Sequence, residues 1–389
     1  MCESARRAEH DFARLVSRLG SPLYWDRFLT QGFQSLSARL RRQLRDLDCW
    51  RGFNQFLNDL AGFVKQPDDC TTLVFSQSRN MIRLAAEFLT QNSKRILATD
   101  LEWPPYLRML RTVAQHNSCE LVIVPLSEAV FKNNLDARQV THRVLHSSKY
   151  SGCDGVFLSD ITHLGVRMPL GHIIPKLKEN RIKTVVDGAQ AINHRPVNVS
   201  KLGCDLYLAG TQKWFQAYHP LRFAIVGTPR SDSVVRSTSD FLFDNEIISD
   251  PLSCFCEELA GHTSQSFGET VNVLPLITAA GALAEIQRKT QIAERTWKIR
   301  KRNARVFAKF VSGGTLMPQL PHASLQSGIS LLTKTSAKSP QNETNVRDFL
   351  QSYEIVASGF PNGTLRFSMP DFYFPFRYLS RVHRALNSL

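Results

Sequence analysis

Apolar residues in the first seventy positions recur three and four residues apart, the spacing of one face of an amphipathic helix. The pattern is clearest over residues 12–19, 33–44 and 53–64. The chain is therefore expected to begin with helices. We assign residues 1–70 to an N-terminal helical segment that contributes to a smaller domain.

The rhythm changes after residue 70, where short runs of β-branched and aliphatic residues alternate with helical stretches. Near-continuous apolar runs indicate strands that are covered on both faces, and such sheets are mostly parallel. We therefore expect an α/β fold with a mostly parallel seven-stranded sheet in a large domain spanning residues 71–285. The seven expected strands are residues 72–75, 95–98, 121–124, 155–158, 183–186, 206–208 and 223–226.

The sequence becomes more polar after the last of these runs. Residues 228–261 are rich in serine and aspartate and are expected to form a loop, and a long apolar helix should begin near residue 274. The remainder begins with a basic helix, continues with weak strands at residues 328–332 and 364–367, and ends in a helix. This pattern predicts a small α+β domain over residues 286–389.

The composition indicates neither a membrane-spanning segment nor a disulfide framework. The longest nearly apolar run, residues 273–284, contains a proline and a glycine and is too short to span a bilayer. Residues 1–15 lack the apolar core of a secretory signal. The eight cysteines are scattered, without zinc-ligand spacing, which is typical of reduced thiols, and we expect a cytoplasmic protein without a metal site. They lie at positions 2, 49, 70, 119, 153, 204, 254 and 256.

The net charge of +14 raises the question of nucleic-acid binding. Basic residues cluster over residues 39–45 and 298–305, but apolar residues recur at helical spacing inside both clusters. The simpler interpretation is that each cluster is the solvated face of an amphipathic helix. We do not expect nucleic acid as a partner, although a basic nucleic-acid-binding protein stays an alternative.

In sheets of this kind, ligands bind beyond the carboxyl ends of the strands. Several expected strands are followed there by groups that can carry chemistry. They are Ser76, Gln77, Ser78, Arg79 and Asn80 after the first run, Asp100, Glu102 and Trp103 after the second, Ser159, Asp160, Thr162 and His163 after the fourth, Asp187, Gln190 and His194 after the fifth, and Gly210, Thr211, Gln212 and Lys213 after the sixth.

Asp187 and Lys213 form the most informative pair among them. Most lysines are surface residues, but Lys213 and Asp187 both follow apolar strands and should meet at one edge. A carboxylate placed at such an edge needs a cationic partner. The protonated pyridine nitrogen of pyridoxal 5'-phosphate is one such partner, and a nearby lysine can form a Schiff base with the cofactor's aldehyde.

The residues from Val185 to Trp214 read VVDGAQAINHRPVNVSKLGCDLYLAGTQKW. The D-G-A-Q-x-x-x-H segment, the later G-C-D and the lysine that follows resemble the core of class V aminotransferases. These are fold-type I pyridoxal-phosphate enzymes, and the group includes cysteine desulfurases, kynureninase and isopenicillin N epimerase-like proteins. The resemblance extends weakly over roughly residues 28–370.

The resemblance implies a role for several residues. Lys213 would be the Schiff-base lysine that also moves protons, and Asp187 would pair with the pyridinium nitrogen. Gln190 and His163 stand where the family places donors to the phenolic oxygen of the cofactor. Trp103 takes the position of the group stacked on the cofactor ring, although core packing is the alternative for this side chain.

The resemblance also implies which residues would bind the cofactor phosphate and the substrate carboxylate. Ser78 and Arg79 follow the first strand, where the family has a glycine- and threonine-rich turn, and Gln212 replaces the usual histidine before the lysine. Thr270 would reach the phosphate of a neighbouring subunit, which implies a homodimer. Arg366 would grip the substrate α-carboxylate in a bidentate pair.

Together these residues predict a pyridoxal-phosphate enzyme that acts on a small-molecule α-amino acid. The family's cysteine desulfurases use a nucleophilic cysteine in the small domain, and no cysteine follows Cys256. We therefore expect an aminotransferase of a biosynthetic pathway and not a desulfurase. A lyase or epimerase of the same family and a catalytically inactive fold relative are the alternatives.

Overall fold

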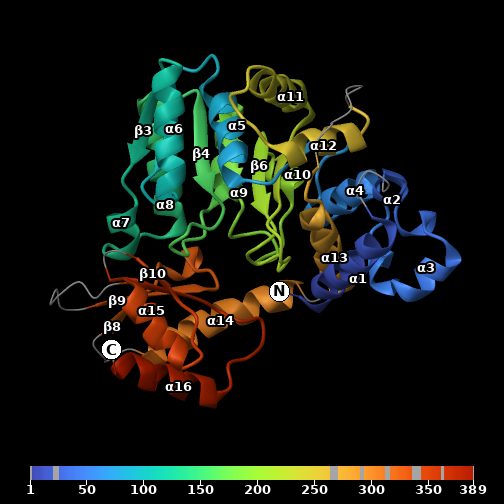
Figure 1. The fold of residues 1–389 in the computed structure, drawn as a ribbon. Coiled ribbons are helices and arrows are strands. Elements are labelled where there is room, and N and C mark those ends of the chain that lie inside the picture. Colours follow the sequence, from blue (N-terminus) through green and yellow to red (C-terminus); the bar gives the residue numbers. More distant parts are fainter. Residues whose placement is uncertain are drawn as a thin grey trace.

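The computed structural model describes residues 2–20, 26–262, 270–289, 293–311, 316–334, 343–360 and 363–388. A seven-stranded sheet forms the centre of the molecule, in the order β1-β7-β6-β5-β4-β2-β3 (Figure 1). The strands are β1 Thr72–Phe75, β2 Arg95–Thr99, β3 Glu120–Val124, β4 Gly155–Ser159, β5 Lys183–Asp187, β6 Leu206–Gly210 and β7 Arg222–Val226. The expected α/β fold and all seven strands are confirmed.

Strand β7 differs from the rest of the sheet in its direction. It runs antiparallel to both of its neighbours, β1 and β6, whereas the other neighbouring strands pair in parallel. The start of β7 therefore lies at the edge where β1 and β6 end. Arg222, its first residue, pairs in register with Phe75 of β1 and with Gly210 of β6.

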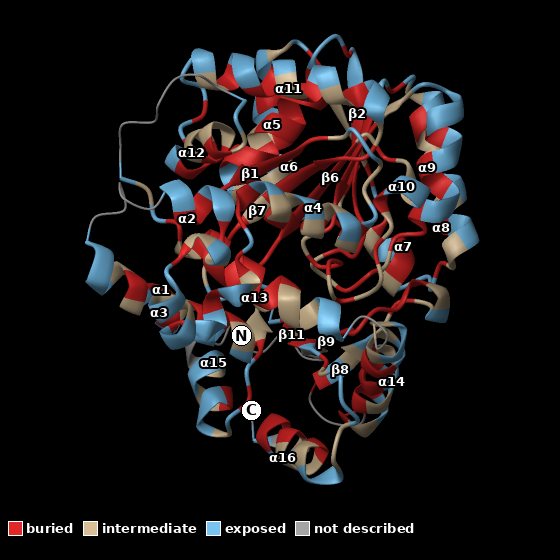
Figure 2. Cartoon of the chain, turned by 90° about the vertical axis from the view of Figure 1, so that its right-hand side faces the viewer, coloured by how far each residue is buried: buried red, intermediate tan, exposed pale blue. Residues whose placement is uncertain are grey.

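Helices cover both faces of the sheet, as the continuous apolar strands predict (Figure 2). One face buries residues of the three helices α5, α6 and α11 in a single apolar cluster. The other face shares a larger cluster with the N-terminal helices and with helices α8, α9 and α13. Their bounds are α5 Ser78–Thr90, α6 Pro104–His116, α7 Ser127–Phe131, α8 Ala137–Tyr150, α9 Leu170–Glu179, α10 Val199–Leu202, α11 Pro229–Asp244 and α13 Leu274–Arg288.

The expected loop over residues 228–261 is wrong, because this stretch forms α11 and α12 (Pro251–Leu259). A proline opens each helix, and the Asp250 side chain accepts a hydrogen bond from the Ser253 N–H at the start of α12. The buried face of α11 combines Val235 and Leu242 with small hydroxyl residues. A face built partly from serine and threonine gives a weak hydrophobic period, which is why the pattern resembled a loop. Cys254 and Cys256 accordingly lie on a helix and not on a surface loop.

The N-terminal segment is helical, as predicted, but less continuous. Its elements are α1 Glu3–Leu19, α2 Asp26–Gln31, η2 Phe33–Ser35, α3 Ala38–Gln43, η3 Arg45–Cys49 and α4 Phe53–Val64. The helix expected over residues 33–44 is interrupted at Leu36, whose extended backbone precedes the helix cap Ser37. In the described part of the chain, α1 packs extensively on α13 (Figure 1).

The C-terminal part forms an antiparallel four-stranded sheet, in the order β10-β11-β9-β8, with its own apolar cluster. Both weak strands expected there are present, as β9 and β11. The elements are α14 Ala293–Val311, β8 Leu316–Gln319, η5 Ala323–Leu325, β9 Ile329–Lys334, α15 Glu343–Ser352, β10 Ser358–Gly359, β11 Leu365–Ser368 and α16 Phe376–Asn387. The domain limits at residues 70 and 285 stay a prediction.

Within the described residues, every helix is too short or too polar to cross a membrane.

Candidate active site

The ends of β5 and β6 bring Asp187 and Lys213 to one edge of the sheet. Asp187 is the last residue of β5 and is buried, and its Oδ1 accepts a hydrogen bond from the Ala189 N–H at 2.9 Å. Lys213 follows β6, which pairs in parallel with β5. The amine and the carboxylate therefore lie at the same edge of the sheet, close enough for each charge to affect the other's pKa.

The two charges influence each other. Burial lowers the pKa of Lys213, the positive charges of Arg366 and Arg222 lower it further, and the charge of Asp187 opposes them. Burial raises the pKa of Asp187, against the charge of Lys213 and the Ala189 hydrogen bond. Lys213 as a whole residue is nevertheless exposed, and the lowered pKa increases the fraction of neutral amine, which is the nucleophilic form.

A buried network fixes Gln190 beside this pair. The Gln190 Oε1 accepts a hydrogen bond from Trp214 Nε1 at 2.8 Å, which leaves the amide nitrogen to donate elsewhere. The His194 ring stacks on Trp214 with centroids 3.7 Å apart. His194 Nδ1 contacts the Gln190 carbonyl at 2.8 Å, and its Nε2 accepts from the Gly328 N–H at 3.0 Å. His194 is therefore a buried packing residue that connects the large sheet to the C-terminal part.

Trp103 and His163 lie together on the same side of the site. Their rings meet edge to face with centroids 5.0 Å apart, and Trp103 remains 38% exposed. Burial lowers the pKa of His163 to about 4, helped by the charges of Arg366 and Lys213. The imidazole is therefore neutral at physiological pH, and its buried Nδ1 has no hydrogen-bond partner among the described residues.

Arg366 reaches the site from the C-terminal sheet. It lies on β11, where its Nη1 donates to the His163 carbonyl at 3.2 Å and its Nη2 to Ser358 Oγ at 3.0 Å. The guanidinium lies 5.9 Å from the centre of the Phe360 ring. Its buried Nε has no partner within the described part of the chain. The structure thus brings Arg366 next to His163.

The structure brings together only some of the residues expected around the phosphate. Ser78 opens α5 and accepts a hydrogen bond from Arg222 Nε at 3.3 Å, and Gln212 Oε1 accepts from Arg222 Nη1 at 2.6 Å. Arg79, the next residue of α5, is exposed. Thr270 is also exposed and has no hydrogen bond to the other expected site residues in the described ranges. The adjoining residues 267–269 of its motif lie outside those ranges.

Sequence reasoning missed Arg222 and Tyr106. The Tyr106 hydroxyl is hydrogen-bonded to Ser78, and burial raises the pKa of Tyr106 to about 12. Arg222 is the first residue of β7, and the strand pattern directs attention only to residues that follow a strand. Tyr106 lies inside α6, three residues after Trp103, and nothing in the strand pattern marks it.

Glu102 follows β2, and the resemblance to class V aminotransferases gives it no role. It is 1% exposed, accepts a hydrogen bond from Thr99 Oγ1 at 2.9 Å and is also bonded by Ser159 Oγ. Burial raises the pKa of Glu102 to about 7, although these hydroxyl groups favour the charged form. A buried carboxyl that titrates near neutrality therefore lies next to Trp103 in the chain.

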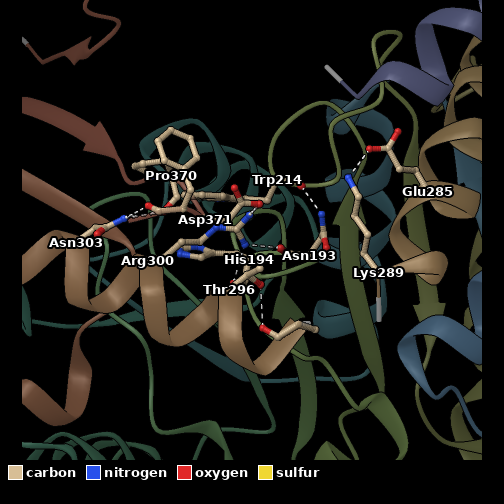
Figure 3. A network of polar contacts seen from close by, with 12 residues as sticks. Asn193, His194, Trp214, Glu285, Lys289, Thr296, Arg300, Asn303, Pro370 and Asp371 are labelled. Atoms are coloured by element: carbon tan, nitrogen blue, oxygen red, sulfur yellow. Dashed lines mark hydrogen bonds and ion pairs between the residues drawn. The ribbon is translucent and has the colours of Figure 1, made fainter. Parts of the chain in front are cut away.

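Arg300 shows that the basic cluster over residues 298–305 is not exposed to solvent at every position. This residue of α14 is buried, and its Nη1 donates to the carbonyls of Asn193 and His194 at 2.7 and 3.1 Å (Figure 3). Its Nη2 pairs with Asp371 at 3.2 Å, and the guanidinium lies 5.0 Å from the Trp214 ring. Lys298, Arg302 and Arg305 are exposed, as expected. Arg300 thus joins α14 to the segment that packs on Gln190.

The donor set at the sheet edge suits pyridoxal phosphate. It combines an accessible amine, a buried carboxylate, a neutral imidazole, an amide with a fixed orientation and two guanidinium groups. The unpartnered Nδ1 of His163 and Nε of Arg366 indicate that a further polar group belongs there. Among the described residues, no cluster of His, Cys, Asp and Glu has the form of a metal site.

A separate cavity of about 600 Å³ lies between α1, η3, α4 and α13, and none of the expected site residues lines it. Its lining residues include four arginines and three aspartates, some of them paired with one another.

The seven-stranded sheet, the small antiparallel sheet and the groups at the sheet edge can be compared with known structures. The fold is that of the type I pyridoxal-phosphate enzymes. One similar solved structure is a lysine-to-alanine mutant of C-DES with glycine covalently linked to its PLP cofactor; the TM-score is 0.67 at 13% identity, covering 100% of this chain and 93% of that one. Another is ureidoglycine-glyoxylate aminotransferase from Bacillus subtilis, with a TM-score of 0.62 at 14% identity, covering 86% and 83%.

The sequence comparisons agree with the fold. Residues 41–217 match the family model of class V aminotransferases, so the resemblance inferred from the DGAQ segment and Lys213 is confirmed. A curated relative, cysteine desulfurase from Klebsiella pneumoniae, is 42% identical over 52 residues. That alignment covers 13% of this chain and 13% of the relative, so the chain spans about an eighth of the length of the curated relatives it matches.

Proposed function

We propose that the protein is a pyridoxal-phosphate enzyme that acts on an α-amino acid, as an aminotransferase of the class V type. The observation that carries the proposal is the placement of Lys213 and Asp187 at one edge of the sheet, close enough to shift each other's pKa. The cofactor, bound through its aldehyde to Lys213, would supply an electron sink. The protein's own residues would bind it, orient it and move the proton.

Each side chain has a task that follows from its chemistry. The buried Asp187 would hold a proton on the pyridine nitrogen, because an uncompensated carboxylate in this position is costly. Lys213, with its lowered pKa, would take and return the substrate α-proton. Trp103 would cover one face of the cofactor ring. The free amide nitrogen of Gln190 and the neutral His163 would donate to its phenolic oxygen.

Arg366 would bind the substrate α-carboxylate. Its guanidinium is held by the His163 carbonyl and Ser358 but is paired with no carboxylate in the described part of the chain. A planar guanidinium suits a carboxylate because both can form two parallel hydrogen bonds. The expected homodimer, with Thr270 completing the neighbouring site, and the biosynthetic role are parts of the same proposal.

The curated relatives are named cysteine desulfurases, so that activity needs separate consideration. All eight cysteines of this chain are described, and burial raises the pKa of every thiol. The thiolate is the nucleophilic form, and none of these sites favours it. This supports our proposal that the protein is not a desulfurase that uses its own cysteine.

Reduction of the purified protein with borohydride in the presence of pyridoxal phosphate tests the proposal. We expect a stable adduct on the peptide that contains Lys213, and a colourless protein that cannot be reconstituted would contradict it. Single-turnover spectra with a panel of amino acids then test the reaction type. Conversion of the cofactor to its pyridoxamine form supports transamination, whereas α-proton exchange without that conversion would favour the lyase or epimerase alternative.

A further inference from the structure

Arg222 lies where the sheet topology joins two parts of the site. Because β7 is antiparallel to both neighbours, Arg222 pairs with the end of β1, which leads into α5, and with the end of β6, which leads to Lys213. Gly210 leaves room for its side chain, since a Cβ on Gly210 would lie 3.1 Å from Arg222 Cδ. The guanidinium thus extends between Ser78 and Gln212.

The hydrogen bonds of Arg222 are all to neutral groups. Its Nε donates to Ser78 Oγ, and its Nη1 donates to Gln212 Oε1 and to the Leu221 carbonyl at 3.1 Å. No carboxylate of the described residues lies within ion-pair distance. Burial lowers the pKa of Arg222, and the guanidinium keeps its charge. An unpaired and half-buried positive charge therefore lies at the start of α5.

The turn that precedes α5 is already occupied by a side chain of the protein. The Ser76 N–H donates to both Asp250 oxygens at 3.2 and 3.0 Å, and the Gln77 N–H donates to Oδ2 at 3.4 Å. The turn over residues 76–80 contains no glycine. Side chains, and not these backbone groups, must therefore meet an anion that binds at this end of the site.

We propose that Arg222, together with Ser78 and Gln212, binds the phosphate group of the cofactor, and that Arg79 does not. The inference rests on the proposed function, because it takes the phosphate of pyridoxal phosphate as the anion. The Nε and Nη1 groups of Arg222 have acceptors, whereas Nη2 has none among the described residues and can donate to a phosphate oxygen. The amide oxygen of Gln212 accepts a hydrogen bond from Arg222, which leaves the amide nitrogen as a second donor for the same anion. The first-turn N–H groups of α5 add their partial positive charge.

The test compares the affinity of the cofactor-free protein for pyridoxal 5'-phosphate and for pyridoxal, which lacks the phosphate. Arg222→Gln should raise the Kd for pyridoxal phosphate about 10- to 100-fold, by the usual strength of charge-assisted hydrogen bonds. The Kd for pyridoxal should change less than about twofold. Arg222→Lys should recover part of the affinity as a point charge. Inorganic phosphate should compete with pyridoxal phosphate in the unmodified protein and less in Arg222→Gln.

Two further variants complete the test. Arg230→Gln removes an exposed charge beyond the opposite end of β7 and is the matched control. Arg79→Gln removes the competing candidate, and both should keep full affinity. Equal losses for the two ligands in Arg222→Gln, no loss at all, or a phosphate-specific loss in Arg79→Gln would overturn the inference. Failure of the unmodified protein to bind pyridoxal phosphate on Lys213 would instead overturn the proposed function.

Discussion

At the scale of single residues, the proposed chemistry depends on Lys213. Lys213→Ala should abolish turnover and leave the fold intact, because an exposed side chain contributes little to packing and only its amine can both hold the cofactor and move the proton. Steady-state kinetics with the best amino acid of the panel would measure the loss, and circular dichroism would check the fold. Substantial remaining activity would contradict the assigned role.

Glu102 gives a second prediction at this scale, on stability against pH. Its pKa in the folded protein is about 7, above its ordinary value of 4.5, so between these values the folded state binds a proton that the unfolded state has released. Stability should therefore fall as the pH rises from about 4.5 to 7 and then stay level. The difference corresponds to a destabilisation of about 3 kcal/mol above pH 7.

Glu102→Gln tests this by removing the titrating group and keeping its shape. The variant should be more stable than the unmodified protein at pH 8 and should show no gain at pH 4.5, as measured by urea unfolding. Because the amide can still bond to Ser159 and Thr99, lost hydrogen bonds should not obscure the effect. An equal difference at both pH values would show that folding does not raise the pKa of Glu102.

At the scale of elements, one carboxylate holds the starts of two helices. Asp250 is 1% exposed and caps α12 through the Ser253 N–H at 3.2 Å. It also bonds to the turn before α5 through Ser76, Gln77 and the Asn80 amide. The position of α5, and with it Ser78, therefore depends on a residue more than 170 positions later in the chain.

Asp250→Ala should lower the free energy of unfolding by about 2–4 kcal/mol, because it leaves several buried N–H groups without an acceptor. Urea denaturation would measure the change. Asp240→Ala, which truncates an exposed aspartate of α11, is a matched control and should have little effect. A loss below about 0.5 kcal/mol in Asp250→Ala would show that water replaces the carboxylate at this turn.

At the scale of the whole molecule, the site depends on the contact between the large sheet and the C-terminal part. Arg366 extends from β11 to the His163 carbonyl, and Arg300 extends from α14 to the carbonyls of Asn193 and His194. Both guanidinium groups cross from one part to the other (Figure 3 shows Arg300). Because we propose that Arg366 binds the substrate carboxylate, substrate binding should depend on how the two parts are oriented.

Arg366→Ala should lower kcat/KM for amino acids about tenfold to a hundredfold, because it removes a charge-assisted pair with the carboxylate. The cofactor's absorbance should not change, since we place Arg366 on the substrate. Arg366→Lys should recover little, because an ammonium cannot form the two parallel bonds. If the alanine variant loses the cofactor and still binds amino acids normally, Arg366 is a structural residue.

The strands and their order along the chain could be predicted from the sequence, as could the placement of Asp187 and Lys213 near the ends of two neighbouring strands. Continuous apolar runs report burial on both faces, and the residues after them had to meet at one edge because the strands are mostly parallel. Such patterns are local, so a single sequence can show them. The helix α11 was missed for the same reason, because serines and threonines complete its buried face and weaken the local period.

The contacts of Arg222 could be found only from the tertiary structure. Arg222 begins β7, and it lies beside Ser78 and Gln212 because that strand runs antiparallel to its neighbours. The direction of a strand within a sheet is set by long-range pairing. It cannot be read from a five-residue apolar run. The link from Asp250 to α5 is likewise a contact between distant segments. Local periodicity therefore indicated the edge of the sheet where we propose the site, and long-range strand pairing brought Arg222 to that edge.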